Sequence, residues 1–205
     1  MVRIAALVSG GGTNLQALLN AQLSGELHSG KIMLVVSNKP GAGALVRAEA
    51  AGVEAFVLAK EKGETAKQYG ERLVALLAMH HIDMLVLAGF LLILDECVIR
   101  AYDGRIVNVH PSLIPAFCGE GYYGLKVHEA ALARGVKVTG ATVHLVNEIP
   151  DGGRILAQKA VEVREGDTAE VLQKRVMEQA EWVLLPQETE RLAKRLATVV
   201  KEKTL

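Results

Sequence analysis

The sequence has only two cysteines, no excess of charge of either sign and no long apolar run. Cys97 and Cys118 cannot form a disulfide framework and lack the spacing of metal ligands, so we expect a reducing compartment. Lysine plus arginine and aspartate plus glutamate number 23 each, which argues against a surface for DNA or RNA. No segment approaches the roughly 20 apolar residues that span a bilayer, and residues 1–4 lack a secretory-signal pattern. These absences predict a soluble, cytoplasmic protein without nucleic-acid or membrane partners.

What the sequence has in abundance is small aliphatic residues: 50% of it is hydrophobic and only 4% is aromatic. Short apolar runs alternate with helical patterns, which is typical of βαβ units around a parallel sheet. We therefore predict one domain over residues 1–205, of the α/β class, with a single doubly wound, mostly parallel sheet and helices on both faces. The strands expected in the first half are 4–8, 32–36, 55–58, 84–87 and 106–109, and the helices follow residue 14 and cover 42–51 and 65–79.

The second half predicts an antiparallel ribbon at the edge of that sheet. Two apolar strands, over 139–146 and 155–163, flank the turn Pro150-Asp151-Gly152-Gly153. The expected helices are 126–134, a long helix from Asp167 towards Pro186 with Asp167 and Glu170 as its capping box, and a helical tail at about 187–205.

The stretch Arg105–Pro115 joins a short β-branched strand to a loop that two prolines restrict. Asn108 and His110 are two residues apart, so in an extended chain they project from the same face. In open α/β sheets, ligands bind where such strands end. An amide donor beside a titratable imidazole fits catalysis, and it fits equally well two side chains that only satisfy the local backbone.

Residues 10–14, Gly-Gly-Gly-Thr-Asn, lie between the first strand and the first helix, where N–H groups and the helix dipole favour an anion. Leu15 occupies the position of the last glycine of a dinucleotide fingerprint, and no Gly-Lys-Ser/Thr motif of a nucleotide-binding P-loop is present. The plain alternative is a glycine turn with Thr13 as the helix cap. Three consecutive glycines exceed what a turn requires, so we favour a phosphomonoester site.

Asp151 follows the strand that contains His144. It is either an ordinary turn aspartate or a carboxylate that faces His110 and raises its pKa, and spacing alone does not decide. We interpret His144 as a packed or hydrogen-bonded structural histidine. Leu91–Leu94 is too apolar for an ordinary surface loop and is either core or the wall of a pocket for a flat ligand.

Taken together, four motifs resemble the phosphoribosylglycinamide (glycinamide ribonucleotide) formyltransferases, a folate-dependent family. The motifs are Ser9-Gly-Gly-Gly-Thr-Asn-Leu-Gln16, Leu87-Ala-Gly-Phe90, Asn108-Val-His-Pro-Ser-Leu-Ile-Pro115 and Asp151-Gly-Gly153. The resemblance runs in order from residue 2 to about Pro186. It implies a formyltransferase-type, Rossmann-like fold and, in purine synthesis, formyl transfer from the co-substrate 10-formyltetrahydrofolate to the amine of glycinamide ribonucleotide, by a monomer or homodimer.

Residue by residue, the resemblance implies that Asn108, His110 and Asp151 are the catalytic trio, and that no metal takes part. Asn108 and protonated His110 donate to the developing oxyanion, while Asp151 keeps His110 charged and relays the amine proton. The resemblance also implies a cis bond at Ile114–Pro115. It assigns the acceptor to Gly11, Gly12, Thr13, Asn14 and Glu181, and the folate to Leu91, Leu92, Ile93, Leu94, Asn108, Asn147, Glu148, Ile149 and Pro150.

The chain departs from the family pattern in two places. Residues Cys118–Gly124 form a longer loop than the shortest members carry. Ala66 and Leu92 stand where some members have basic side chains near the folate. The candidates to replace them are Lys60, Lys62 and Lys67.

Three other functions are compatible with parts of this pattern. Formyltetrahydrofolate deformylase and methionyl-tRNA formyltransferase each add a further domain, which we do not expect here because the first strand begins at Val2. A catalytically silent nucleotide-binding module would have the same fold. The intact Asn108, His110 and Asp151 argue against that module.

Overall fold

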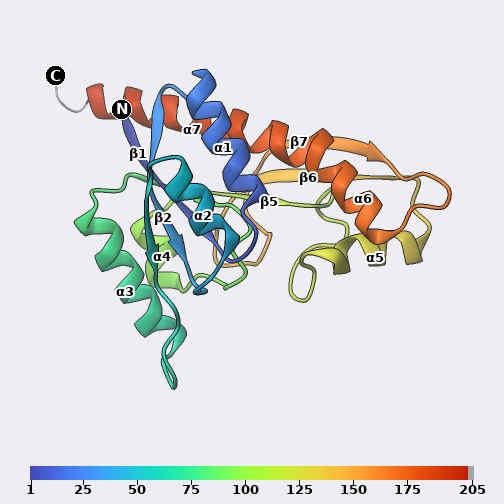
Figure 1. The fold of residues 1–205 in the computed structure, drawn as a ribbon, viewed down its shortest axis with the longest axis horizontal. Coiled ribbons are helices and arrows are strands. Elements are labelled where there is room, and N and C mark those ends of the chain that lie inside the picture. The colour runs from blue at the N-terminus through green and yellow to red at the C-terminus, as the bar shows by residue number, and fades with distance from the viewer. Residues whose placement is uncertain (203–205) are drawn as a thin grey trace.

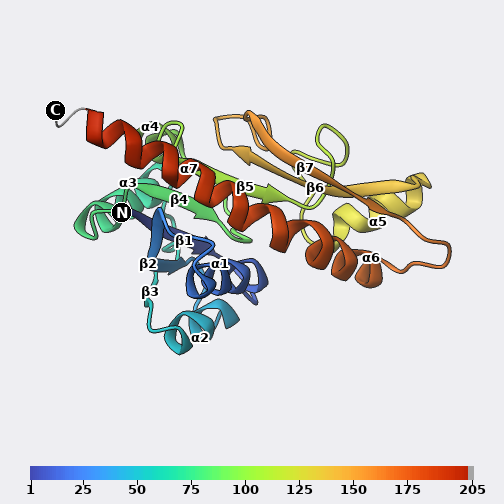
Figure 2. The same ribbon diagram turned by 90° about the horizontal axis from the view of Figure 1, so that it is seen from above.

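Seven strands form one sheet in the computed structural model, which describes residues 1–202 and the side chains of residues 1–198. The strands are β1 (Val2–Val8), β2 (Gly30–Ser37), β3 (Glu54–Val57), β4 (Met84–Leu87), β5 (Ile106–His110), β6 (Val138–Leu145) and β7 (Ile155–Glu162). Their order is β3-β2-β1-β4-β5-β6-β7, with β1 to β5 parallel and β6 antiparallel to both of its neighbours (Figures 1 and 2). The predicted mostly parallel sheet with an antiparallel edge ribbon is therefore confirmed.

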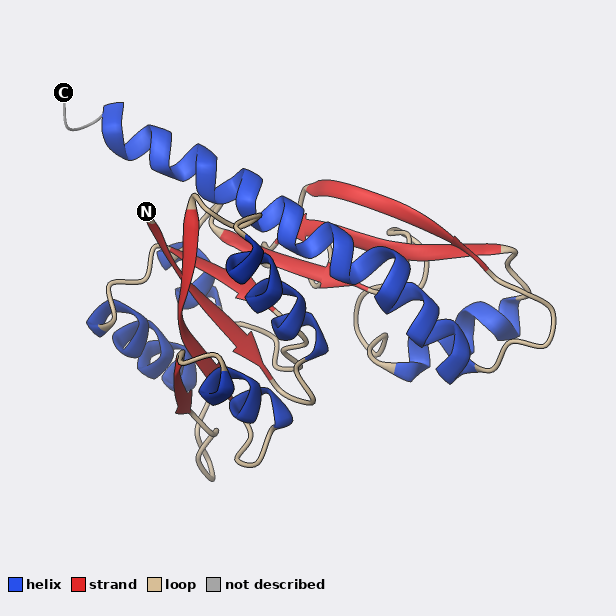
Figure 3. Cartoon of the chain, turned by 45° about the horizontal axis from the view of Figure 1, so that its top comes forward, coloured by secondary structure: helices blue, strands red, loops and turns tan. Residues whose placement is uncertain are grey.

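Helices cover both faces of this sheet because side chains that alternate along a strand face two separate cores. Ile4, Ala6 and Val8 of β1 pack in one core, and Ala5 and Leu7 pack in the other. The first core includes α1 (Thr13–Ser24), α2 (Gly43–Ala50), α6 (Ala169–Val176) and α7 (Trp182–Glu202), and the second includes α3 (Ala66–Met79) and α4 (Glu96–Ala101). Figure 3 shows the helices on the two sides of the strands, so the doubly wound arrangement is also confirmed.

The C-terminal helices form one continuous stretch in which the π-helical segment η1 (Met177–Glu181) joins α6 to α7, and α7 crosses the sheet (Figure 2). The predicted capping box is wrong: Thr168 caps α6 by accepting from the N–H of Val171, because two bonds of 2.5 and 2.6 Å hold Asp167 on Arg175. Pro186 lies inside α7, where burial of the apolar helix face offsets the backbone hydrogen bond that proline removes. Residues 203–205 of the predicted tail lie outside the described residues.

Between residues 1 and 202, no helix has both the length and the apolar character needed to cross a membrane.

The sheet changes direction at β1, which has β2 on one side and β4 on the other. At such a switch point the loops that leave neighbouring strands separate, and a crevice forms between them. Ser9 joins the two loops that border it: its N–H donates to the carbonyl of Gly89 at 3.0 Å, and its Oγ accepts from the N–H of Leu91 at 2.8 Å. The loop after β5 contains a cis bond at Ile114–Pro115, as expected.

Candidate active site

A cavity of about 640 Å³ lies at this switch point, over the carboxyl ends of β4 and β5. Its lining includes the predicted trio, both Asn14 and Glu181, and every residue assigned to the folate. Gly11, Gly12 and Thr13 do not line the cavity and immediately precede Asn14 in the chain. The structure thus gathers most of the predicted site residues around one space, although they come from five separate segments.

The pairing of β5 with β6 places Asn108 opposite His144. Nδ2 of Asn108 lies 3.1 Å from Nε2 of His144, and Nδ1 of His144 lies 2.8 Å from the carbonyl oxygen of Leu145. Because a carbonyl only accepts, Nδ1 of His144 carries a proton, and the Asn108 amide donates to Nε2. The amide of Asn108 keeps its second N–H for a ligand. His144 is buried and hydrogen-bonded as expected, but what it supports is the site itself.

Asp151 lies on the turn after β6, and the fold returns this turn to the end of β5. Its backbone has a positive φ of 55°, and a Cβ on the nearby Gly153 would collide with the carbonyl oxygen of Leu145. This tight geometry puts Oδ2 of Asp151 3.4 Å from Nδ1 of His110, and its Oδ1 3.5 Å from Nε2 of His144. Of the two interpretations left open by the sequence, the structure shows the one in which Asp151 faces His110.

Two backbone groups of the loop after β5 hold this pair. The carbonyl of Phe117 accepts from Nε2 of His110 at 2.8 Å, and the N–H of Gly119 donates to Oδ2 of Asp151 at 2.9 Å. Phe117 has a positive φ of 49°, which is rare for a bulky side chain. Since Nε2 of His110 is already used, Nδ1 is the nitrogen that faces Asp151. Neither Phe117 nor Gly119 carries a signal in the sequence, because both act through the backbone.

Burial lowers the pKa of His110, and it outweighs the Asp151 carboxylate and the Phe117 carbonyl, which both raise this pKa. Asp151 thus raises this pKa as expected, but the expectation that it keeps His110 charged is wrong, because the residue is only 4% exposed and its imidazolium form loses hydration there. Burial also raises the pKa of Asp151, but the neighbouring His144 and His110 and the N–H of Gly119 together bring it below its usual value. The site thus holds an ionised carboxylate beside a largely neutral imidazole.

In the glycine loop, Gly10–Asn14, close packing requires a glycine at one position. Gly12 is the N-cap residue of α1 with a φ of 76°, and a Cβ on it would lie 2.7 Å from both Cα and Cβ of Ala44. At Gly10 and Gly11 an added Cβ would meet nothing within 4 Å. The loop therefore needs glycine at Gly12 for its own structure and has open space at the other two positions.

The start of α1 keeps its first N–H groups free for an anion. Among the described side chains none caps this helix, and Oγ1 of Thr13 donates instead to Sδ of Met177 at 3.7 Å, so the alternative with Thr13 as cap is wrong. Arg47 was not predicted from the sequence: its Nε donates to the carbonyl of Gly11 at 2.8 Å and its Nη1 donates to Gln16 at 3.0 Å. Arg47 and Thr13 line an adjoining hollow of about 430 Å³. A guanidinium beside a helix N-terminus suits a phosphate.

Asn14 and Glu181 form a buried pair on the cavity wall. Nδ2 of Asn14 donates to Oε2 of Glu181 at 2.8 Å, whereas Oδ1 of Asn14 has no partner among the described residues. Burial raises the pKa of Glu181 to about 7, although the bond from Asn14 acts in the opposite direction. The pair therefore offers a ligand one unused acceptor and a carboxyl group that exchanges a proton near neutral pH.

Two loops give the cavity an apolar wall. Leu91 and Ile93 are 50% and 68% exposed and Ile149 is 65% exposed, while Leu94 is buried. All four line the cavity. Oδ1 of Asn147 accepts from the N–H of Ile149 at 3.1 Å, which shapes the second loop. In the described part of the chain, no three His, Cys, Asp or Glu side chains are placed to hold a metal ion.

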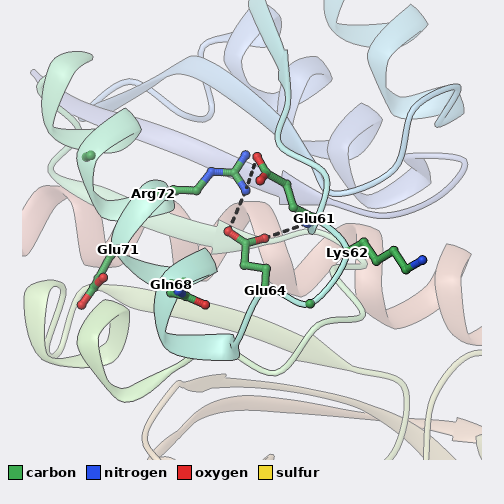
Figure 4. Close-up of a pocket in the computed structure, with 8 residues that line it drawn as sticks. Glu61, Lys62, Glu64, Gln68, Glu71 and Arg72 are labelled. Atoms are coloured by element: carbon green, nitrogen blue, oxygen red, sulfur yellow. Dashed lines mark hydrogen bonds and ion pairs between the residues drawn. The ribbon is translucent and has the colours of Figure 1, made fainter.

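The lysines proposed from the sequence for the folate side do not line this cavity. They are Lys60, Lys62 and Lys67. A separate, open hollow lies near them at the start of α3, where Arg72 binds Glu64 at 2.7 Å and lies 3.3 Å from Glu61 (Figure 4). The charges of Arg72, Glu61 and Glu64 are therefore paired with one another. The lysine that does line the cavity is Lys126, at the start of α5 (Leu125–Arg134).

A family model, curated relatives and solved structures all match this chain to the same kind of protein. Residues 2–188 match the family described as formyl transferase. The chain is 42% identical to the chloroplastic phosphoribosylglycinamide formyltransferase of Vigna unguiculata over 85% of this chain and 56% of that protein, so it spans little more than half of that relative. It is 36% identical to the phosphoribosylglycinamide formyltransferase of Bacillus subtilis (strain 168), over 86% of this chain and 87% of that one. The crystal structure of glycinamide ribonucleotide transformylase 1 from Symbiobacterium toebii superposes with a TM-score of 0.88 at 37% identity, covering 95% and 88% of the two chains.

Proposed function

The chain belongs to the formyl transferase family, and on this premise we propose that it transfers a formyl group from 10-formyltetrahydrofolate to the amine of glycinamide ribonucleotide. We propose that residues 1–205 act as one formyltransferase domain, in a reducing cytoplasm that suits the free thiols of Cys97 and Cys118. The observation that carries the proposal is the meeting of Asn108, His110 and Asp151 on the wall of one cavity with a polar and an apolar side.

The acceptor binds on the polar side in this proposal. Its phosphate lies at the N-terminus of α1, where unpaired N–H groups and Arg47 provide positive potential. Its ribose and amine extend into the cavity towards Asn14 and Glu181, which supply an acceptor oxygen and a carboxyl group. Polar groups thus line the path of the bound acceptor from the glycine loop to the trio.

The formyl donor binds on the apolar side. A flat pterin ring suits the space between the exposed aliphatic side chains of Leu91 and Ile93 and the loop that carries Ile149. Asn147, Glu148 and the other residues of that loop border the same space and offer polar atoms to the edge of the ring. This arrangement brings the formyl carbon to the trio from the side opposite to the amine.

Formyl transfer requires the amine to attack the formyl carbon, which places a negative charge on the formyl oxygen. The free N–H of Asn108 and a proton on Nδ1 of His110 stabilise that oxygen. The attacking nitrogen becomes positive and gives its proton to the carboxylate of Asp151, directly or through water. As the oxyanion collapses, the bond between the formyl carbon and the folate nitrogen breaks, and that nitrogen takes up the proton from Asp151. Because the pKa of His110 is low in the free site, we propose that ligand charge promotes its protonation during the reaction.

The test is a formyl-transfer assay with the purified chain, 10-formyltetrahydrofolate and glycinamide ribonucleotide, in which both the formylated acceptor and free formate are measured. We expect formylated acceptor in amounts equal to the folate consumed. Formate release at the same rate with and without acceptor would instead identify a deformylase. No consumption of folate, together with binding of a nucleotide, would identify a silent nucleotide-binding module.

A further inference from the structure

The charges that line the cavity are unevenly divided between the two signs. Four carboxyl groups line it, while Lys126 is the single lysine or arginine to do so among the described residues. The carboxyl groups belong to Glu120, Glu148, Asp151 and Glu181. Both substrates of the proposed reaction are anions, since one carries a phosphate and the other a glutamate, and an excess of carboxylates repels them. An anionic group that enters the cavity therefore finds one cation there.

Lys126 is held by a neighbouring aromatic side chain. Its Nζ donates to the hydroxyl oxygen of Tyr123 at 3.1 Å and lies 4.6 Å from the centre of the Tyr123 ring. A hydrogen bond and a cation–π contact together restrict a lysine side chain that is otherwise highly mobile. Tyr123 is 49% exposed and also lines the cavity, so the ammonium and hydroxyl groups remain accessible to a ligand.

The segment that carries Lys126 is also fixed to the reacting groups. Phe117 and Gly119, in the loop that leads into α5, make the backbone bonds to His110 and Asp151 described above. The Phe117 ring packs edge-on against the ring of Tyr122, with centroids 6.4 Å apart. The helix that carries Lys126, α5, packs against α6 (Figures 1 and 2), and Gln173 of α6 lines the cavity. Lys126 thus stands at a defined place on the cavity wall between the catalytic loop and α6.

We propose that Lys126, oriented by Tyr123, binds an anionic oxygen of one of the two substrates, an inference that rests on the proposed function. The shared chemistry is a carboxylate or phosphate oxygen that accepts from Nζ. With the acceptor phosphate at the N-terminus of α1, as proposed above, the glutamate of the folate donor supplies this oxygen; an acceptor phosphate that reaches Lys126 instead is the alternative source. The Cys118–Gly124 loop, which departs from the shortest family members, then provides substrate affinity as well as catalytic geometry.

The test measures dissociation constants by calorimetry for the wild type, Lys126→Gln, Lys126→Arg and Arg134→Gln. Arg134→Gln is the matched control, because it removes an exposed cation from the last turn of the same helix, outside the cavity. The probes are glycinamide ribonucleotide, its dephosphorylated form, a non-transferable 10-formyltetrahydrofolate analogue, and that analogue without its glutamate. We expect Lys126→Gln to weaken one charged probe by roughly tenfold and to leave its uncharged counterpart unchanged. Lys126→Arg should retain most of the affinity, and Arg134→Gln all of it.

Loss confined to the phosphorylated acceptor, or confined to the glutamyl folate, supports the proposal and identifies the source of the anion. Equal dissociation constants for the wild type and Lys126→Gln overturn it, as does an equal loss for charged and uncharged probes. Tyr123→Phe, which removes only the hydroxyl, should weaken the same probe by a smaller factor. Failure of the proposed function gives a different result, since the wild type itself would then transfer no formyl group.

Discussion

Two loops border the candidate site, and they are built in different ways. The glycine loop Gly10–Asn14 takes its shape from a positive φ at Gly12 and from close packing on Ala44, and its working groups are backbone N–H groups. The loop from Pro111 to Gly124 is instead held by hydrogen bonds to two titratable side chains, those of His110 and Asp151. The shape of the first loop thus rests on steric packing, whereas the second loop rests on hydrogen bonds to side chains that can change charge. Binding and chemistry should therefore be separable by mutation.

The largest effect should come from Asp151→Asn, which keeps the shape of the side chain and removes the charge that faces His110. We expect kcat to fall by about 10²- to 10⁴-fold, with little change in the KM for the acceptor. The pKa of His110 is lowered by burial and raised by Asp151, so losing the carboxylate lowers it further and moves the alkaline limb of the pH–rate profile to lower pH. Asn108→Ala should lower kcat by about 10²-fold without moving that limb.

A double variant shows whether the pair is one unit. Combining Asp151→Asn with His110→Ala should cost little more than the worse single substitution, because a unit is lost only once. Multiplied losses would mean that the two residues act independently, although Oδ2 and Nδ1 lie only 3.4 Å apart.

Acid should destabilise the region of the second loop more than that of the first. His128 of α5 is fully buried, neither of its ring nitrogens has a partner among the described residues, and burial lowers its pKa to about 4. The unfolded chain, with a histidine pKa of about 6.5, binds the proton first, so stability falls as pH drops from about 6.5 to about 4. The difference in pKa corresponds to a loss on the order of 3 kcal/mol.

The measurement for His128 is urea unfolding at several pH values in the wild type and in His128→Leu. We expect the variant to lose much less stability between pH 6.5 and pH 4. Parallel curves for the two proteins would show that His128 is not the group responsible. Native-state hydrogen exchange should locate the loss in α5 and its preceding loop.

The glycine loop can be broken on its own by Gly12→Ala. The added Cβ meets Ala44 at 2.7 Å and the residue is forced into a left-handed conformation, so we expect a loss of about 1–3 kcal/mol in stability. The KM for the acceptor should rise more than tenfold, because the N–H groups move, while the KM for the folate and the pH profile stay unchanged. Gly11→Ala, where the Cβ has open space, is the control for stability. Equal rises in both KM values would contradict a phosphate site here.

The smallest effect should follow Phe117→Gly, which relieves the positive φ and removes the ring that packs on Tyr122. The carbonyl that accepts from His110 remains, but a more mobile backbone holds it less firmly. We expect kcat to fall by less than about tenfold, with the acceptor KM unchanged and the alkaline limb of the pH profile slightly lower, since that carbonyl raises the pKa of His110. Tyr122→Leu, which removes the ring pair alone, should leave the pH profile in place.

Periodicity was sufficient to predict the sheet, because apolar runs and helical stripes reflect burial on the two sides of each strand. The faces of β5 were equally predictable, since Asn108 and His110 differ by two residues in an extended chain. Prediction failed where two local partners competed. Asp167 is a good N-cap residue in isolation, but Arg175, eight residues along the chain, holds its carboxylate, and Thr168 caps α6 instead.

The charge state of the site was not predictable either. Whether the pKa of His110 lies above or below its usual value depends on how completely the imidazole is buried beside Asp151, and burial is a property of the whole fold. Arg47 and Lys126 were missed, and the position of His144 beside Asn108 was not predicted, for a related reason. Each reaches the site from another element, and no spacing along the chain reveals the register of β5 with β6 or the packing of α2 and α5.

The sequence by itself determined the class of the fold, the glycine loop and the identity of the polar residues at the end of β5, because these depend on backbone preferences and on the alternation of side chains. Only the tertiary structure decided that Asp151 returns across some forty residues to face His110, that backbone groups of Phe117 and Gly119 hold the pair, and that burial outweighs the carboxylate in setting the pKa of His110. The physical reason is that hydrogen-bond partners and desolvation depend on distances in space, which a sequence specifies only through the complete fold.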